Sequence, residues 1–342
     1  MSQEKKITMA HGSGGRATND LIREIFAQAF TNPVLDAMED AAVVPGNEKI
    51  AFTTDSFVVE PLEFPGGDIG RLSVCGTVND LLMRGAVPKY LTCGFVLQEG
   101  LDIGLLERIV KSLAATAREA GVEVVAGDTK VVEGNGGLII NTAGVGFVPE
   151  NVCISASNCR VGDAILVSGN LGDHHAAILS RRMGISNTIE SDCAPLGEMV
   201  GALLQAGIRL HCLRDITRGG LGTVLKELAE ASQVTMALDE TRLPIDVQVR
   251  DFCGLMGLDP MYMGNEGKLV AFVAPEDAVR ACELISSCAY GNNATIIGAV
   301  TDEKSGEAYV NTSIGGKRVL DVLFGEGLPR ICSLLRRDSV FV

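Results

Sequence analysis

The sequence predicts an α/β (α+β) protein built of two domains, and three observations support this prediction. The chain has 342 residues, which suits two domains of about 150 residues each. Stretches with a helical period alternate with short β-branched runs in both halves. Hydrophobic residues make up 46% of the chain and 40 residues are glycine, as in a globular protein with many tight turns. We expect domains at 1–155 and 156–314 and a flexible tail at 315–342.

Helical and strand patterns alternate through the N-terminal half. Residues 17–30 carry apolar side chains at helical spacing after a glycine-rich opening. Further helices are predicted at 69–86 and 105–120, and strands at 50–59, 90–97, 122–130 and 138–149. The C-terminal half repeats this alternation, with strands predicted at 163–169, 233–238, 269–274 and 294–300 and helices at 196–206, 219–232 and 276–288. Such alternation favours α/β architecture over an all-β fold.

Charge and composition exclude several classes of function. The formal net charge is −14 and no dense basic run stands out, which argues against a nucleic-acid partner. No apolar stretch approaches the roughly 20 residues of a membrane span, and the opening residues lack the apolar core of a signal peptide. We therefore expect a cytoplasmic protein with no membrane partner. The ten cysteines form no CxxC pair and read mostly as core thiols.

Aspartates recur where predicted elements end. They are Asp40, Asp55, Asp80, Asp128 and Asp215, in the stretches MEDAAVV, TTDSF, GTVNDLL, AGDTK and LRDITRGG. Each alone is also explained as a capping or turn residue. Together, carboxylates at element ends could converge on Mg²⁺, which takes hard oxygen ligands and commonly bridges substrate phosphates.

Glycine-rich stretches lie beside several of these acids, at 11–15, 64–70 and 217–222. Backbone N–H groups at such turns can cradle phosphate. The chain has no GxxxxGK[ST] motif and no GxGxxG opening a strand, turn and helix, so a nucleotide site would be of a less common kind. Lys130 and Glu266 are candidates for handling charge and protons, or are solvated loop charges.

The ordered set TTDSF, GTVNDLL, GDTK, RDITRGG and NEGK resembles a family of ATP-dependent enzymes. This family includes aminoimidazole ribonucleotide synthetase, selenophosphate synthetase and thiamine-phosphate kinase. Within it, AHGSGG, FPGGDIG and above all LPRIC resemble the HypE family, the carbamoyl dehydratases of hydrogenase maturation. The resemblance extends from about residue 7 to residue 332.

The resemblance implies a fold, an activity and partners. Two α/β domains are expected, with N-terminal domains pairing in a homodimer. The cysteine of PRIC, Cys332, would be loaded with a carbamoyl group by the carbamoyltransferase HypF, and ATP would drive its dehydration to a thiocyanate. The nitrile would pass to iron on a HypC–HypD complex and become a cyanide ligand of [NiFe] hydrogenase.

The resemblance also implies site residues. Mg²⁺ would be held by Asp40, Asp55, Asp80, Asp128 and Asp215, and ATP by Gly12, Ser13, Gly14, Gly15, Asp55, Asn79, Asp128, Thr129 and Arg218. Cys332 would carry the carbamoyl group, Lys130 would stabilise developing negative charge, and Glu266 would be the general base.

Two alternatives remain open. The chain could be another member of the ATP-dependent family, although a selenophosphate synthetase would be expected to carry Cys or selenocysteine in the loop HGSGGRAT, which has none. It could also be a scaffold with a degenerate nucleotide site, although all five aspartates are present. Ten residues, SLLRRDSVFV, follow Cys332, where the family ends in the cysteine, and the sequence does not decide whether they are native, processed or foreign.

Overall fold

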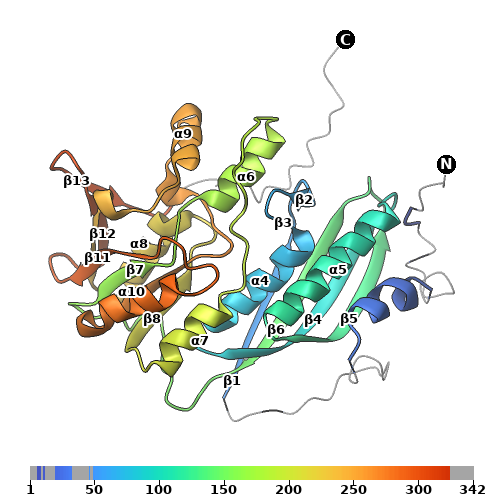
Figure 1. Cartoon of the computed structure of the whole chain (residues 1–342), viewed down its shortest axis with the longest axis horizontal. Coiled ribbons are helices and arrows are strands. Elements are labelled where there is room, and N and C mark those ends of the chain that lie inside the picture. The colour runs from blue at the N-terminus through green and yellow to red at the C-terminus, as the bar shows by residue number, and fades with distance from the viewer. Residues whose placement is uncertain (1–5, 9–10, 12–19, 33–45, 47–48, 324–342) are drawn as a thin grey trace.

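Two β-sheets organise the molecule (Figure 1). The computed structural model describes residues 6–8, 11, 20–32, 46 and 49–323. Within them, a four-stranded sheet belongs to the N-terminal half and a seven-stranded sheet to the C-terminal half. A single hydrophobic cluster includes residues of both halves, such as Val74 and Leu213. The two halves therefore share a packed interface, and the candidate site lies at it.

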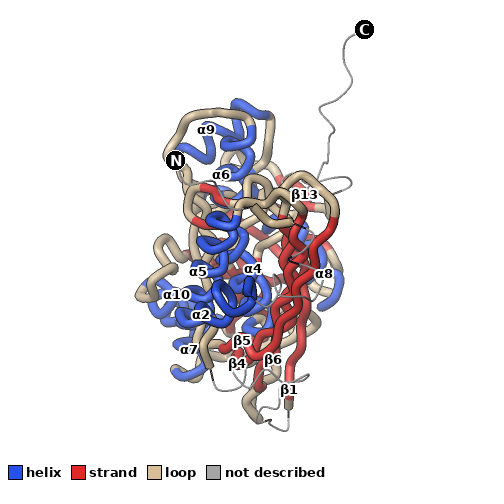
Figure 2. The backbone as a smooth tube through the Cα atoms, turned by 90° about the vertical axis from the view of Figure 1, so that its right-hand side faces the viewer, coloured by secondary structure: helices blue, strands red, loops and turns tan. Residues whose placement is uncertain are grey.

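The N-terminal sheet has the strand order β1-β6-β4-β5. Its strands are β1 (Ile50–Phe57), β4 (Val87–Gln98), β5 (Glu123–Val132) and β6 (Leu138–Phe147). Only β4 and β5 run parallel. The helices α4 (Ile69–Leu82) and α5 (Ile103–Glu119) pack on one face of this sheet (Figure 2). Asp68 and Asp102 begin these helices by accepting hydrogen bonds from backbone N–H groups of the first turn.

Short elements complete this half. A helical segment, η2 (Ile22–Phe26) followed by α2 (Ala27–Ala29), packs on α5, and the strands β2 (Glu63–Phe64) and β3 (Gly67–Asp68) form a hairpin before α4. The helix predicted at 17–30 is confirmed over its described part.

Strand register places residues on the two faces of the N-terminal sheet. Thr142 bonds to Thr77 of α4, so the side chain of Thr142 lies on the helix face. Asp55 is directly opposite Thr142 and shares that face, because paired residues point the same way. The next row, Ser56, Asn141, Gly94 and Asp128, points to the other face. We call that other face the open face.

The C-terminal sheet has the order β13-β12-β9-β11-β7-β10-β8. Its strands are β7 (Ala164–Val167), β8 (Leu210–Asp215), β9 (Thr235–Asp239), β10 (Leu269–Val273), β11 (Thr295–Thr301), β12 (Glu307–Asn311) and β13 (Lys317–Leu320). Every residue of β7 and β10 is buried, which matches their continuous apolar sequences.

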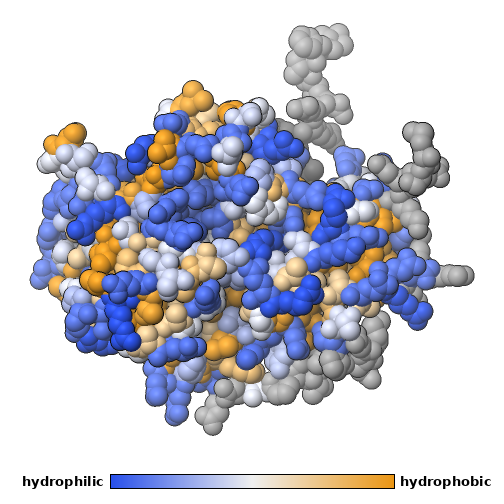
Figure 3. All heavy atoms as spheres, viewed as in Figure 1, coloured by the Kyte–Doolittle hydropathy of each residue, from blue (hydrophilic) through white to orange (hydrophobic). Residues whose placement is uncertain are grey.

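Helices pack around this second sheet. They are α6 (Asp173–Arg182), α7 (Gly197–Gln205), α8 (Gly220–Ser232), α9 (Val247–Met256) and α10 (Ala278–Ser286), with 3₁₀ turns η3 (Glu240–Arg242), η4 (Pro260–Tyr262) and η5 (Pro275–Asp277). Viewed as in Figure 3, hydrophobic and hydrophilic residues are interspersed over the surface. Within the described ranges, no helix is long and apolar enough to cross a membrane.

The predicted helices and strands are confirmed in both halves, with two differences. Helices α6 and α9 and strands β2, β3, β8 and β12 were not predicted. Helix α6, for example, is rich in polar residues (DHHAAILSRR) and shows only a weak apolar stripe. The prediction of a tail from residue 315 is wrong at its start, because β13 pairs with β12 and keeps the chain in the sheet as far as Leu320. The other domain limits remain predictions.

Candidate functional site

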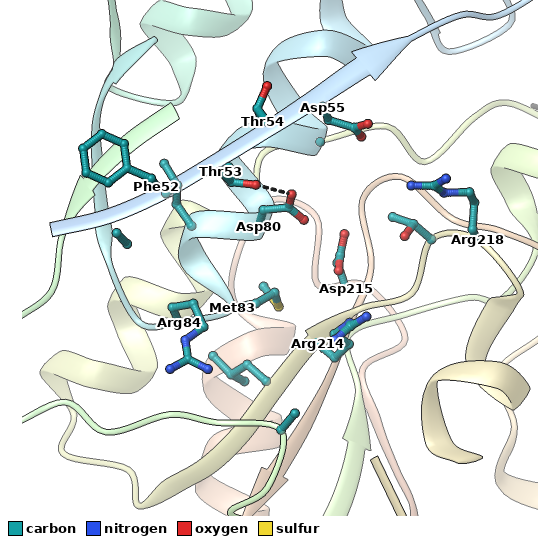
Figure 4. Close-up of a pocket in the computed structure, with 16 residues that line it drawn as sticks. Phe52, Thr53, Thr54, Asp55, Asp80, Met83, Arg84, Arg214, Asp215 and Arg218 are labelled. Atoms are coloured by element: carbon teal, nitrogen blue, oxygen red, sulfur yellow. Dashed lines mark hydrogen bonds between the residues drawn. The ribbon is translucent and has the colours of Figure 1, made fainter. Parts of the chain in front are cut away.

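A cavity of about 420 Å³ lies between the two halves of the chain (Figure 4). Strand β1 and helix α4 form one wall, and the end of β8 with the loop after it forms the other. Its lining includes Thr53, Thr54, Asp55, Asp80, Arg84, Arg214, Asp215, Thr217 and Arg218. Three of the five predicted metal aspartates therefore come together in one cavity.

Asp80 is held in this cavity by β1. Thr53 donates a hydrogen bond from Oγ1 to Asp80 Oδ2 over 2.9 Å. Thr53 and Asp55 are two residues apart on a strand, so both side chains lie on the face that meets α4. Burial raises the pKa of Asp80, and the charges of Asp55 and Glu266 add to this, while the Thr53 bond and Arg214 act against it.

Asp215, the last residue of β8, faces Asp80 across the cavity (Figure 4). Burial raises the pKa of Asp215 to about 7, and the charges of Asp80 and Glu266 contribute further. Nearby carboxylates in a buried place are unfavourable unless a cation or a proton joins them. The chain then turns sharply into α8, with Gly219 and Gly220 both at positive φ. A Cβ on Gly220 would lie 2.6 Å from a backbone oxygen of Met261.

The donor set fits a hard divalent cation held jointly with phosphates. Carboxylate oxygens are the ligands that Mg²⁺ prefers. Among the residues that the structure describes, no three His, Cys, Asp or Glu side chains are close enough to hold a metal ion by themselves. A cation here would therefore need further oxygen ligands, such as those of phosphate or water. Asp40 lies outside the described residues.

Glu266 is buried beside this cavity. Only 4% of its surface is exposed, and its charge is close enough to raise the pKa of both Asp80 and Asp215. Its backbone N–H donates to Asp192 Oδ1 over 3.0 Å. The alternative of a solvated loop charge is therefore wrong for Glu266.

Asn79 joins the two halves. It is buried, its Oδ1 accepts from the N–H of Leu196 over 2.9 Å, and its Nδ2 donates to the carbonyl of Ala194 over 3.1 Å. These bonds occupy the amide, so the structure gives Asn79 a bridging role, and its predicted contact with a nucleotide remains a prediction. Arg218, by contrast, lines the cavity directly.

Asp128, Thr129 and Lys130 lie elsewhere. Strand β5 is the edge of the sheet opposite to β1, and Asp128 is on the open face. Lys130 Nζ and Asp128 Oδ1 form an ion pair of 2.9 Å, with both side chains 66% exposed. Within one chain, the structure does not bring these residues to the cavity.

The glycine-rich opening (Gly12, Ser13, Gly14 and Gly15) and Cys332 lie outside the described residues. The last described residues, however, are anchored close to the cavity. The N–H of Asp321 donates to the hydroxyl of Tyr262, and that of Leu323 to Thr223 Oγ1. Thr223 is in the first turn of α8, five residues after Arg218.

Several residues of the site were missed from the sequence. Thr53 had an available signal, because it alternates with Asp55 along a strand. No sequence signal marked Arg84 or Arg214, because charged residues are common on the surface near the ends of helices and strands. Asp192 lies in a loop and is brought to Glu266 only by the tertiary fold.

Comparison with known proteins shows which family and fold the chain shares. The family model "AIR synthase related protein, N-terminal domain" matches residues 38–148, and its C-terminal counterpart matches residues 160–311. Structures of thiamine monophosphate kinase share the fold, for example that from Stenotrophomonas maltophilia, with 20% identity, a TM-score of 0.66 and coverage of 91% of this chain and 99% of that one.

Curated relatives are much more similar. The carbamoyl dehydratase HypE of Azotobacter vinelandii is 49% identical, covering 95% of this chain and 97% of its own length. That of Escherichia coli is 44% identical over 95% and 99%. A crystal structure of HypE in complex with ATP has 44% identity and a TM-score of 0.91, covering 95% of this chain and 99% of that one. The chain therefore belongs to the AIR synthase related proteins and, among them, to the HypE family of hydrogenase maturation proteins.

Proposed function

We propose that this chain is an ATP-dependent carbamoyl dehydratase that converts a carbamoyl group on Cys332 to a thiocyanate and so supplies cyanide ligands for [NiFe] hydrogenase. The observation that carries the proposal is the cavity where Asp55, Asp80 and Asp215 meet beside buried Glu266. Relatives named carbamoyl dehydratase HypE and the ATP complex of a HypE support it.

The reaction removes one molecule of water from the S-carboxamide. The carboxamide oxygen is a poor leaving group and must first be activated. It would attack the γ-phosphorus of ATP, become phosphorylated and release ADP. Loss of phosphate, with both protons leaving the nitrogen, then gives the C≡N bond. Phosphoryl transfer depends mainly on positioning and charge neutralisation, which the arginines and the carboxylates of the cavity would provide.

Protein groups take defined parts in this scheme. Asp40, Asp55, Asp80 and Asp215, with Asp128 from a second copy, would hold Mg²⁺, and Mg²⁺ when bound supplies charge neutralisation. Arg218 lines the cavity and would contact a phosphate. Glu266 is buried beside these carboxylates and would accept a proton from the nitrogen as the general base.

In this proposal, Cys332 would reach the cavity from the anchor of the chain at Leu323. Leu323 is bonded to the first turn of α8, and the nine residues from there to Cys332 span up to roughly 30 Å when extended. A tail of this length would let one thiol visit a donor enzyme, the cavity and an acceptor. A solved HypE–HypF complex, 46% identical to this chain with a TM-score of 0.78 over 89% of this chain and 99% of that one, supports HypF as the donor. We propose HypC–HypD as the acceptor.

A homodimer would complete the site. Asp128 and Lys130 are on the open face, and the cavity is on the helix face of the same sheet. The open face also carries apolar side chains, among them Phe52, which is 73% exposed, and the ring pair of Tyr90 and Phe147. Strand β1 is both an edge of this sheet and a wall of the cavity. A second copy docked on the open face would cover these rings and would place its own Lys130 beside that edge.

Mass spectrometry of the tail peptide tests the proposed function. Trypsin releases Ile331–Arg336, which contains Cys332. After incubation with HypF and carbamoyl phosphate, with and without ATP, we expect a carbamoyl adduct on Cys332 that loses one water only in the sample with ATP. A Cys332→Ala variant should bind ATP but show no carbamoyl-dependent hydrolysis.

Two other outcomes would redirect the proposal. Reaction only after truncation at Cys332 would mean that the ten following residues block the site. No adduct in either form would contradict the dehydratase and favour another ATP-dependent reaction or a scaffold.

A further inference from the structure

We infer that Asp192 is a positioning residue for the proposed reaction, because it fixes the backbone of Glu266 relative to the metal carboxylate Asp80. The inference rests on the proposed function, in which Glu266 is the general base. Asp192 lies in the loop between α6 and α7, and its side chain is only 3% exposed. It is far from Glu266 in sequence and adjacent to it in space.

Both oxygens of Asp192 accept hydrogen bonds from the Glu266 turn. Oδ1 accepts from the N–H of Glu266 over 3.0 Å, and Oδ2 accepts from Asn265 Nδ2 over 2.9 Å. The side-chain amide of Asn265 is fixed in orientation, because its Oδ1 accepts from the N–H of Gly172 and its Nδ2 also donates to the carbonyl of Asn170. Exchanging the two atoms would break these hydrogen bonds. Position 192 therefore faces two donors and requires a side chain with two acceptors, which is a carboxylate.

The turn is packed tightly against the same loop. A Cβ on Gly267 would lie 1.8 Å from the carbonyl oxygen of Asp192, so the two backbones can approach only because residue 267 is glycine. Lys268, also buried, places Nζ 3.9 Å from Asp192 Oδ2. This ammonium offsets the cost of burying the aspartate charge.

The loop continues across to α4. The carbonyl of Glu266 accepts from the N–H of Ala194 over 3.4 Å, and Asn79 holds both Ala194 and Leu196. Asn79 directly precedes Asp80. Residues 192–196, which we call the bridging segment, therefore bond to the backbone of the proposed base at one end and to the helix of the metal carboxylate at the other.

This arrangement explains how two reactive carboxylates in different halves of the chain keep one geometry. Glu266 belongs to the C-terminal half and Asp80 to the N-terminal half, so a small shift between the halves would separate them. Misplacement by about 1 Å can cost a reaction about 100-fold. The bridging segment opposes such a shift through bonds to both sides.

A double-mutant cycle tests the inference. The variants are Asp192→Asn, Glu266→Gln and the combination, with carbamoyl-dependent ATP hydrolysis and nitrile formation measured in single turnover. In Asp192→Asn, the NH₂ group of the new amide would face either the N–H of Glu266 or the Nδ2 of Asn265. One of the two hydrogen bonds would then be lost. We expect the turnover rate of Asp192→Asn to fall about 10- to 100-fold, the Kd for ATP to change little, and the same substitution to cost almost nothing further once Glu266 is replaced by Gln.

Asp163→Asn is the matched control. Asp163 is also a buried aspartate, 2% exposed, that accepts from a backbone N–H (that of Arg160) and pairs with a basic side chain, His211. It should lose stability without loss of turnover rate. Hydrogen exchange of peptides covering 264–269 should quicken in Asp192→Asn and stay unchanged in Asp163→Asn. If Asp192→Asn does not fold, Asp192→Ser, whose side chain keeps one acceptor oxygen and has no N–H donor, replaces it in the same cycle.

Each result decides the inference. Wild-type turnover in Asp192→Asn alongside a slow Glu266→Gln would overturn it, and so would independent, multiplying effects in the double variant. Absence of carbamoyl-dependent hydrolysis in the wild type would instead overturn the proposed function, and the inference with it.

Discussion

Asp80 and Asp128 both belong to the N-terminal half of the chain but lie in two different environments. Asp80 is on the helix packed against one face of the sheet, bonded to Thr53 and close to Asp215. Asp128 is on the open face at the far edge, paired with Lys130 and largely exposed. Two aspartates near the ends of helices or strands therefore share a site only when the fold places them on the same face and the same edge of the sheet.

The two faces of the N-terminal sheet therefore carry different groups of the proposed site. The helix face supplies the carboxylates that would hold a cation, and the open face supplies an exposed cation, Lys130. If both serve one reaction, they do so in two copies of the chain. The predictions below separate the contributions of the two faces.

Replacing the deepest carboxylate should have the largest effect. Asp215→Asn would remove a proposed ligand for the cation. Metal stabilisation of a transferring phosphate is worth several kcal/mol, so ATP turnover should fall by about 100-fold or more. The fold should persist, because the amide has the same shape and removes a buried charge. Steady-state hydrolysis and thermal unfolding check both statements. Retained turnover would remove Asp215 from the site.

Replacing the exposed lysine should have the next largest effect. Lys130→Ala should lower turnover by about 10- to 100-fold if Lys130 stabilises developing charge, yet change the free energy of unfolding by less than about 0.5 kcal/mol, as for surface positions. Lys111→Ala is the control, since Lys111 is also exposed beside an acidic side chain, Glu107. Equal activities in the two variants would confine the site to the helix face.

Mixing the two defective chains asks whether the faces cooperate between copies. Equal amounts of Asp215→Asn and Lys130→Ala chains, unfolded and refolded together, should recover about a quarter of wild-type activity, because half of the dimers would then hold one intact site. Each chain refolded alone is the control. A mixture no more active than its parts would show that Lys130 serves its own chain.

A carboxylate outside the cavity should make stability, rather than turnover, depend on pH. Burial raises the pKa of Asp173 to about 7, and the charge of Asp192 adds to it; its Oδ1 has no hydrogen-bond partner among the described residues. The folded chain thus keeps a proton that the unfolded chain releases above pH about 4, so stability falls as pH rises from about 4 to about 7.

Asp173→Asn should remove that penalty. At pH 8 the variant should be more stable than wild type by up to about 4 kcal/mol, and near pH 4 the two should be alike. Urea unfolding at the two pH values measures the difference. A constant difference between the chains at both pH values would show that Asp173 does not titrate in this window.

The sequence predicts the elements well because period and turn residues are local properties. Helix α5 and the strands β7 and β10 have the expected periods or buried runs. It predicts part of the site for the same reason, since Asp80 and Asp215 each lie near the end of an element, on the two sides of one cavity.

The remaining site depends on register and on contacts between distant segments. The pairing of β4 with β5 is irregular between Leu91 and Thr92, and one extra residue reverses the face of every later side chain. Simple alternation along β5 therefore does not predict which face of the sheet Asp128 lies on. Asp192 and Asn79 meet Glu266 only through the packing of the two halves.

The most direct measurement follows the chemical state of Cys332 in a chain whose cavity is disabled. Wild type and Asp215→Asn would both be loaded by HypF and carbamoyl phosphate, then given ATP, and the tryptic peptide of Cys332 weighed. If the cavity performs the dehydration, both chains carry the carbamoyl group and only the wild-type peptide then loses one water. Loss of water in both chains would contradict the assignment of the reaction to this cavity.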